Sequence, residues 1–169
     1  MTEANETVAR RLASVPTAAG LATRLAVAEL DRRKIDPGPL LARAGLSALS
    51  LDYGGRIDAR SQVEFLEVAS RALGDDFLGL SLAEQFDLRE LGMLYYVAAS
   101  SHCLGDALRR LERYGHVANE ALIAKLHKGH PLRLELSYAG VPRHLDRHQM
   151  ECFALTFVRL CRQLVGQRV

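Results

Sequence analysis

The chain has 169 residues, of which 49% are hydrophobic and 25% charged, and its formal net charge is +2. This length fits one domain with a core of its own, and so small a net charge does not by itself predict a nucleic-acid or membrane partner. The first residues lack the apolar core of a signal peptide, and the longest apolar run is far shorter than the ~20 residues of a membrane-spanning helix. We therefore expect a cytoplasmic protein that has no membrane partner.

The beginning of the chain predicts a leader followed by a helix. Residues 1–16 are polar and alanine-rich, so we expect them to be a disordered leader. The next segment predicts a helix from Thr17 to about Lys34, in which Thr17 serves as the N-cap. Pro37 and Pro39 then stop this helix.

Several shorter helices are expected before residue 117, separated by turn residues. Gly45 suits the end of one helix and is followed by an expected loop over residues 46–57. Asp58 is the expected N-cap of the next helix, and Gly74 its end. The expected helices cover residues 40–44, 58–73, 75–86, 91–100 and 104–116.

A β-hairpin is predicted after these helices, because the period of the apolar residues changes from helical to alternating. The strands are expected near residues 120–127 and 132–138, joined by the turn residues 128–131. Pairing Lys125 with Glu135 places Leu126 beside Leu134, which satisfies both faces of the hairpin.

The last predicted element is a long helix over residues 145–165. Its apolar residues recur every three or four positions, as expected for a helix with one buried face. The expected inward residues are Met150, Phe153, Ala154, Phe157, Leu160, Cys161 and Leu164. The fold class is therefore a helix-rich α+β single domain with a small antiparallel hairpin.

The cysteines and histidines indicate no enzyme chemistry. Cys103, Cys152 and Cys161 form no CxxC pair and lie in apolar helical patterns, which is typical of reduced, buried thiols. The sequence also lacks a glycine-rich phosphate loop, a GxSxG elbow and an HExxH motif. We expect no enzyme activity and no cofactor.

A metal site is only weakly indicated. His144 and His148 are four residues apart, and Cys152 follows one turn later, so the three side chains could share one helix face. The same spacing arises by chance at a solvated helix start, and Arg147 between the histidines disfavours a dication. We therefore expect no metal there.

One segment resembles a helix-turn-helix. Residues 37–53 contain a short helix and a glycine turn, as in a small DNA-binding motif. The part that would be the recognition helix contains an acid and two glycines but no basic residue to reach phosphates or base edges. DNA binding through 37–53 remains an alternative reading, and a less favoured one.

A run in the middle of the chain resembles a known family. The residues that carry the resemblance are Leu91-Gly92-x-Leu94-x-Tyr96, Ala99-Ser100-Ser101, Leu104-Gly105-x-Ala107-Leu108 and Arg113-Tyr114. They resemble the N-terminal, arabinose-binding-like effector domain of AraC-type (AraC/XylS family) bacterial transcription regulators.

The resemblance implies that residues 17–169 are a regulatory domain that binds a small-molecule effector and controls a C-terminal helix-turn-helix domain. That DNA-binding domain is absent from this sequence, so promoter DNA would be contacted only by the missing part. The domain itself is expected to be truncated at its C-terminus. Homodimerisation is also implied for this domain, and a pure dimerisation module is the main alternative to an effector sensor.

The expected effector pocket lies where the 91–100 helix, the 104–116 helix and the hairpin meet, because ligand pockets are mostly apolar with a few polar groups. The ligand-binding candidates are Tyr95, Tyr96, Tyr114, His116 and Asn119. The alternative reading is that the tyrosines belong to the core and bond backbone or water through their hydroxyl groups.

Overall fold

Helices make up most of the structure. The computed structural model describes residues 16–51, 55–129 and 131–166. The α-helices are α2 (Leu21–Arg32), α3 (Gly38–Arg43), α4 (Ala59–Leu73), α5 (Leu78–Gln85), α6 (Met93–Ala99), α7 (Leu104–Ala118) and α8 (Arg147–Leu164). The single-turn 3-10 helices are η1 (Ala48–Leu51) and η2 (Leu88–Leu91), and the strands are β1 (Thr17–Ala18), β2 (Ile57–Asp58), β3 (Leu122–His127) and β4 (Arg133–Tyr138). This arrangement confirms the expected helix-rich α+β class.

The start of the first helix differs from its prediction. Thr17 is not an N-cap but lies in β1, where it pairs with Asp58 of β2. Helix α2 begins four residues later, after Gly20, whose φ of 70° is accessible to glycine at little cost. The expected leader lies outside the described residues except for Pro16, whose carbonyl accepts a hydrogen bond from Ala59 N.

Helix α4 begins and ends as predicted. The Asp58 side chain accepts a hydrogen bond from Ser61 N at 2.8 Å, which satisfies one of the free amides of the first turn. Gly74 ends the helix with a φ of 64°. The expected loop before α4 is more regular than predicted, because it contains η1 and β2.

The hairpin has the predicted register. Lys125 lies opposite Glu135, Leu126 opposite Leu134 and Ala124 opposite Leu136. The apolar members of these pairs are partly buried, and Lys125 and Glu135 are exposed. Alternation and charge pairing therefore fix this register, as a shift by one residue would exchange the faces.

Helix α8 buries a face that is more polar than predicted. Leu160 is buried as expected, but Ala154 is exposed. The buried residues of this helix also include three polar ones that the prediction had not placed inside, namely His148, Gln149 and Thr156. This polar face brings hydrogen-bonding groups into the centre of the molecule.

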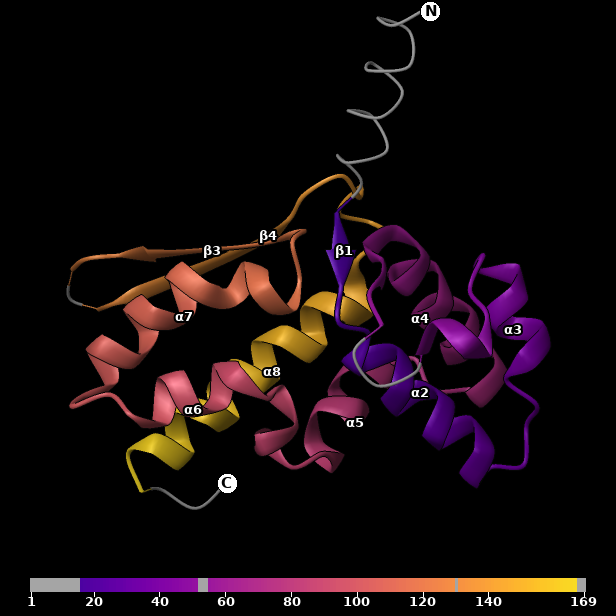
Figure 1. Cartoon of the computed structure of the whole chain (residues 1–169), viewed down its shortest axis with the longest axis horizontal. Coiled ribbons are helices and arrows are strands. Elements are labelled where there is room, and N and C mark those ends of the chain that lie inside the picture. Colours follow the sequence, from indigo (N-terminus) through magenta and orange to yellow (C-terminus); the bar gives the residue numbers. More distant parts are fainter. Residues whose placement is uncertain (1–15, 52–54, 130, 167–169) are drawn as a thin grey trace, which may run out of the picture.

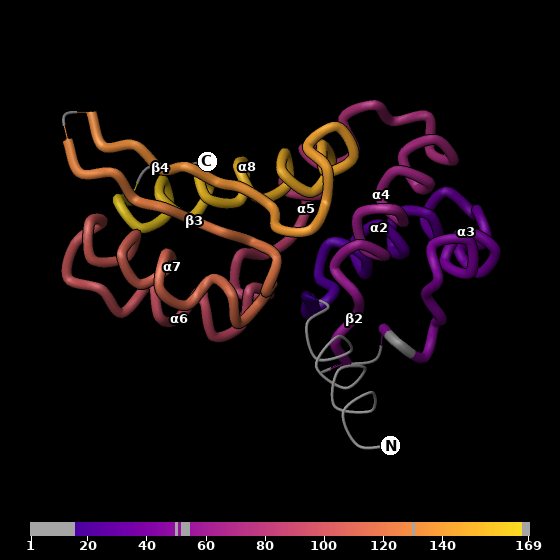
Figure 2. Tube along the Cα trace, turned by 90° about the horizontal axis from the view of Figure 1, so that it is seen from above, coloured from indigo at the N-terminus to yellow at the C-terminus, as the bar shows by residue number. Residues whose placement is uncertain are grey.

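Helices α5 and α8 hold two halves of the molecule together. Figure 1 shows α2, α3 and α4 on one side and α6, α7 and the hairpin on the other, with α8 running diagonally between them. Figure 2 shows the same division from above. One apolar cluster fills the α2–α4 half and another lies among α6, α7 and the second part of α8. Strand β1 also joins the halves, because Ala18 forms an isolated bridge with Asn119.

The exposure of the three cysteines differs in part from the prediction. Cys103 is exposed, which corrects the expectation that all three cysteines are buried, whereas Cys152 is buried and Cys161 partly so.

In the expected helix-turn-helix range, α3 is followed by only the single 3-10 turn η1, and residues 52–54 lie outside the described residues. Across the described residues, no helix is both long and apolar enough to cross a membrane.

Candidate functional site

Two small hollows adjoin in the middle of the molecule. The first, which we call the polar pocket because the side-chain amides of Gln62, Asn119 and Gln149 are part of its otherwise largely apolar lining, has a volume of about 100 Å³. It lies among the start of α2, the end of α7 and the first half of α8. The apolar pocket has a volume of about 60 Å³ and lies between α7 and α8. The hollows share the lining residues Leu91, Ala118, Asn119, Phe153 and Thr156. We call the two together the central cavity.

A chain of buried side-chain hydrogen bonds forms one wall of the polar pocket. Gln62 Nε2 on α4 donates to Gln149 Oε1 on α8 at 2.5 Å. Thr23 Oγ1 on α2 donates to Gln62 Oε1 at 3.4 Å. Buried amides and hydroxyls are nearly always hydrogen-bonded, so this chain fixes three helices at the pocket.

Asn119 forms the opposite polar corner of the central cavity. Its side-chain nitrogen donates to the Tyr138 hydroxyl at 2.9 Å, and its side-chain oxygen accepts from Ala121 N at 3.0 Å. The Tyr138 hydroxyl in turn donates to the Ala59 carbonyl at 3.5 Å. Asn119 therefore links the start of the hairpin to α4, next to the β1 bridge.

The buried side chains of the cavity wall are uncharged at neutral pH, although the half-buried Arg24 and the exposed Glu90 also line the polar pocket. Burial raises the pKa of the Tyr138 phenol to about 12, although the hydrogen bond from Asn119 opposes the shift. Burial also raises the pKa of the Cys152 thiol to about 11. The buried amides and hydroxyls carry no charge, so this wall can bind a neutral polar group but offers no activated thiolate nucleophile.

A glycine leaves room in the apolar pocket. Gly115 is buried on α7, and a Cβ placed there would meet no atom within 4 Å. The rest of the lining is largely aliphatic and aromatic, including Leu94, Leu111 and Phe157. The apolar pocket can therefore accept a hydrocarbon group beside the polar wall.

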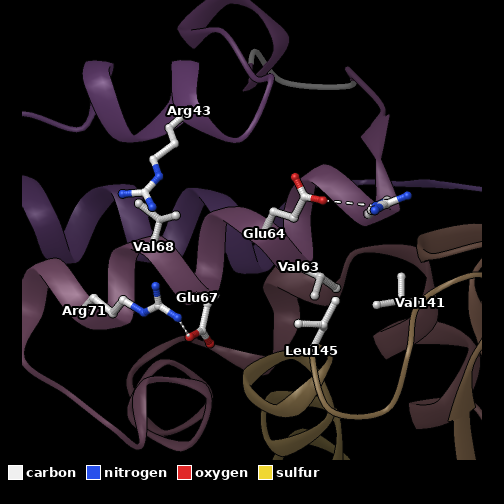
Figure 3. A pocket seen from close by; sticks show the side chains of 9 residues that line it. Arg43, Val63, Glu64, Glu67, Val68, Arg71, Val141 and Leu145 are labelled. Carbon is white, nitrogen blue, oxygen red and sulfur yellow. Dashed lines mark hydrogen bonds and ion pairs between the residues drawn. The ribbon is translucent and has the colours of Figure 1, made fainter.

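A larger hollow on the surface of α4 has a different character. It has a volume of about 240 Å³, and Figure 3 shows Val63 of α4 near Val141 and Leu145 at its apolar side. Its charged side chains largely pair with one another: Arg71 Nη2 lies 2.6 Å from Glu67 Oε1, and Arg60 Nε lies 3.1 Å from Glu64 Oε1. These mutual ion pairs make the surface hollow a weaker candidate than the central cavity.

The five ligand-binding candidates predicted from the sequence do not lie together in the structure. Only Asn119 lines the central cavity. Tyr95 is partly buried and accepts a hydrogen bond from Gln163 at 2.9 Å, whereas Tyr96 and His116 are exposed. Tyr114 lines a separate outer groove between α6 and α7.

Of the three weak metal candidates, Cys152 lines the central cavity, and His144 and His148 do not. His144 is exposed, whereas His148 is buried with Nε2 3.6 Å from Glu67 Oε2 and Nδ1 3.8 Å from Glu151 Oε2. Among the described residues, no group of three or more histidine, cysteine, aspartate or glutamate side chains could hold a metal ion.

Sequence reasoning missed Gln62, Gln149 and Thr156 as lining residues. Polar helix residues were assigned to the solvent side, as is usual for an amphipathic helix. The spacing of these residues could have indicated their burial. Gln149, Cys152 and Thr156 recur every three or four residues on the face of α8 that also carries Leu160.

The helix-rich α+β fold and its central cavity, whose buried polar side chains are uncharged, fit the class of regulatory domains. Residues 35–169 match the family model described as the arabinose-binding domain of AraC transcription regulators, N-terminal. The chain therefore belongs to this family of N-terminal regulatory domains. No curated protein matches the chain significantly.

Proposed function

We propose that this chain is the effector-sensing domain of an AraC-type regulator and that its effector binds in the central cavity. The observation that carries the proposal is the pairing of a neutral, hydrogen-bonding wall with an apolar pocket inside a domain of this family. In this proposal a separate helix-turn-helix domain contacts promoter DNA, and the regulator acts in the cytoplasm, as a homodimer where dimerisation is needed.

The lining supports a small organic effector with an uncharged polar group. Gln62, Gln149 and Asn119 offer amide donors and acceptors, which suit hydroxyl or amide groups of a ligand. A hydrocarbon part of the ligand would lie beside Gly115 in the apolar pocket.

The size of the cavity links binding to regulation. Its two parts, about 100 and 60 Å³, are smaller than the ~300 Å³ of typical ligand sites. Any but the smallest effector must therefore widen the space between α2, α7 and α8. Because these helices belong to different halves, an effector that prefers the wider form shifts the population toward it.

Binding is tested by a thermal-shift screen with L-arabinose, other neutral sugars and small neutral amphipathic compounds. A ligand that binds only the native state raises the Tm, by an amount that grows with the logarithm of its concentration once this exceeds Kd. We expect this shift to be lost in Gly115→Leu, whose side chain fills the apolar pocket, and to persist in Gly115→Ala. An effector that shifts wild type and Gly115→Leu equally would place its site elsewhere.

The regulatory role needs a separate measurement. A promoter reporter driven by the complete regulator should respond to the compound found in the screen, and Gly115→Leu should abolish the response. A regulator that activates transcription equally with and without every compound that binds the domain would contradict the sensing role.

A further inference from the structure

A large open hollow lies between α6 and α7, and none of its lining residues lines the central cavity. It is an open groove of about 690 Å³. Figure 2 shows α6 and α7 along one outer side of the molecule, on the side opposite α8 and β4. We call this hollow the α6–α7 groove; its lining includes Met93, Val97, Arg109, Arg110, Arg113 and Tyr114.

The charges of the α6–α7 groove are unbalanced. Its one carboxylate, on Asp106, pairs with Arg109. Arg110 Nη1 donates to the Val97 carbonyl at 3.1 Å and to Ser100 Oγ at 2.9 Å; both acceptors are neutral, and Arg110 forms no ion pair with a described residue. The guanidinium of Arg113 lies 5.4 Å from the centre of the Tyr114 ring and, within the described part of the chain, makes no hydrogen bond or ion pair.

The exposed side chain of Met93 lines the same groove, and Tyr96 of α6 lies outside the lining, next to Val97 in the chain. Met93 and Tyr96 are 54% and 62% exposed, and as residues i and i+3 of α6 they share one face. Arginine, tyrosine and methionine are enriched at the centres of protein interfaces, whereas lysine and glutamate are depleted there. The groove therefore has the composition of an interface rather than that of an ordinary solvated helix face.

We propose that the α6–α7 groove docks an acidic, amphipathic segment of a partner protein. Carboxylates of the segment pair with Arg113 and with the free side of the Arg110 guanidinium, which Val97 and Ser100 hold in position. Apolar side chains of the segment cover Met93 and Tyr96. This inference does not depend on the effector proposal, because no residue lines both the groove and the central cavity.

A protein segment fits the groove better than a nucleic acid does. Nucleic-acid affinity comes from a series of cations along the phosphate backbone, and here Asp106 neutralises one of three arginines. Exposed Met93 adds apolar area that a phosphate backbone cannot use. The mixture of two available cations and apolar surface matches alternating acidic and apolar side chains.

Fluorescence polarisation with a short fluorescein-labelled peptide of alternating glutamate and leucine tests the proposal. We expect saturable binding that weakens as salt is raised, because exposed ion pairs are screened. Arg113→Glu should weaken binding by about tenfold or more, and Arg113→Gln by a smaller factor. Met93→Ser should also weaken binding, since it removes apolar contact.

The matched control is Arg133→Glu, which reverses an exposed arginine on β4, far from the groove. It should leave the affinity within about twofold of wild type. Equal binding by wild type, Arg113→Glu and Met93→Ser, or no binding at all, would overturn the proposal. Tighter binding of a labelled duplex DNA that Arg113→Glu abolishes would also overturn it, because the groove would then be a nucleic-acid site.

Discussion

The side chains of Gln62 and Gln149 meet in the interior, where Gln62 Nε2 donates to Gln149 Oε1 at 2.5 Å. Gln62 is 2% and Gln149 1% exposed, so neither amide can exchange this bond for bulk water. The bond joins α4 to α8 at the wall of the central cavity. It therefore contributes both to stability and to the shape of the proposed effector site.

Gln149→Leu should destabilise the domain by about 1–3 kcal/mol, because it leaves the Gln62 amide nitrogen buried without an acceptor. The double variant Gln62→Leu/Gln149→Leu should recover part of this loss, since both polar partners are then removed. Urea unfolding measures these differences, with Gln85→Leu, at an exposed position at the end of α5, as control. Additive losses in the double variant would show that the two amides do not act as a pair.

Tyr138→Phe should change how stability depends on alkaline pH. The phenol has a folded pKa of about 12, raised from 10.0 mainly by burial. Between these values the unfolded chain loses the proton that the folded chain keeps, so the free energy of unfolding falls as pH rises. Two pKa units correspond to about 3 kcal/mol.

The measurement compares the free energy of unfolding of wild type and Tyr138→Phe between pH 9 and the highest pH at which the protein stays folded. At pH 9 the variant should already be less stable, because Asn119 loses its acceptor at 2.9 Å. That difference should then shrink as pH rises. A constant difference across this range would mean that ionisation of Tyr138 does not cause the fall in the free energy of unfolding at alkaline pH.

Local patterns were sufficient for the hairpin and for α4. The hairpin register follows from alternation within twelve paired residues, and the Lys125–Glu135 pair lies where charge pairing placed it. The caps of α4 depend on Asp58 and Gly74 alone, through a side-chain acceptor and a positive φ. Such features were predictable because the residues that cause them are close in sequence.

Features that depend on distant partners were not predictable in the same way. Thr17 suits an N-cap, but its pairing with Asp58 places it in a strand. The polar wall requires α4 and α8 to bring Gln62 and Gln149 together across 87 residues. Asn119 was the one predicted ligand-binding residue that lines this cavity, because it lies at the junction of α7 and β3, whereas Tyr96 faces outward on α6.

Cys152 should react slowly with iodoacetamide in the folded protein. Its side chain is buried, and its thiol pKa is raised to about 11 by that burial. At pH 8 the small thiolate fraction alone should slow alkylation by about a hundredfold relative to an ordinary cysteine. Mass spectrometry of timed samples should show modification of the exposed Cys103 first. Equal rates at Cys103 and Cys152 would mean that the α8 face opens readily.

Two buried glycines should respond in opposite ways to the same substitution. At Gly79 on α5 an added Cβ would lie 2.1 Å from the His148 carbonyl oxygen and 2.9 Å from Glu151 Cβ, so α5 and α8 could not keep their close approach. Gly79→Ala should therefore cost at least about 1–3 kcal/mol, the usual range for overpacking. At Gly115 the added Cβ meets no atom within 4 Å, and Gly115→Ala should stabilise the domain by about 0.5–1 kcal/mol through helix propensity.

Thermal and urea unfolding of the two variants measure the difference in stability. A Gly79→Ala variant as stable as wild type would show that α5 and α8 can move apart without loss of stability. Because the two substitutions add the same methyl group, the difference between them isolates the packing of α5 on α8 and the open space beside α7.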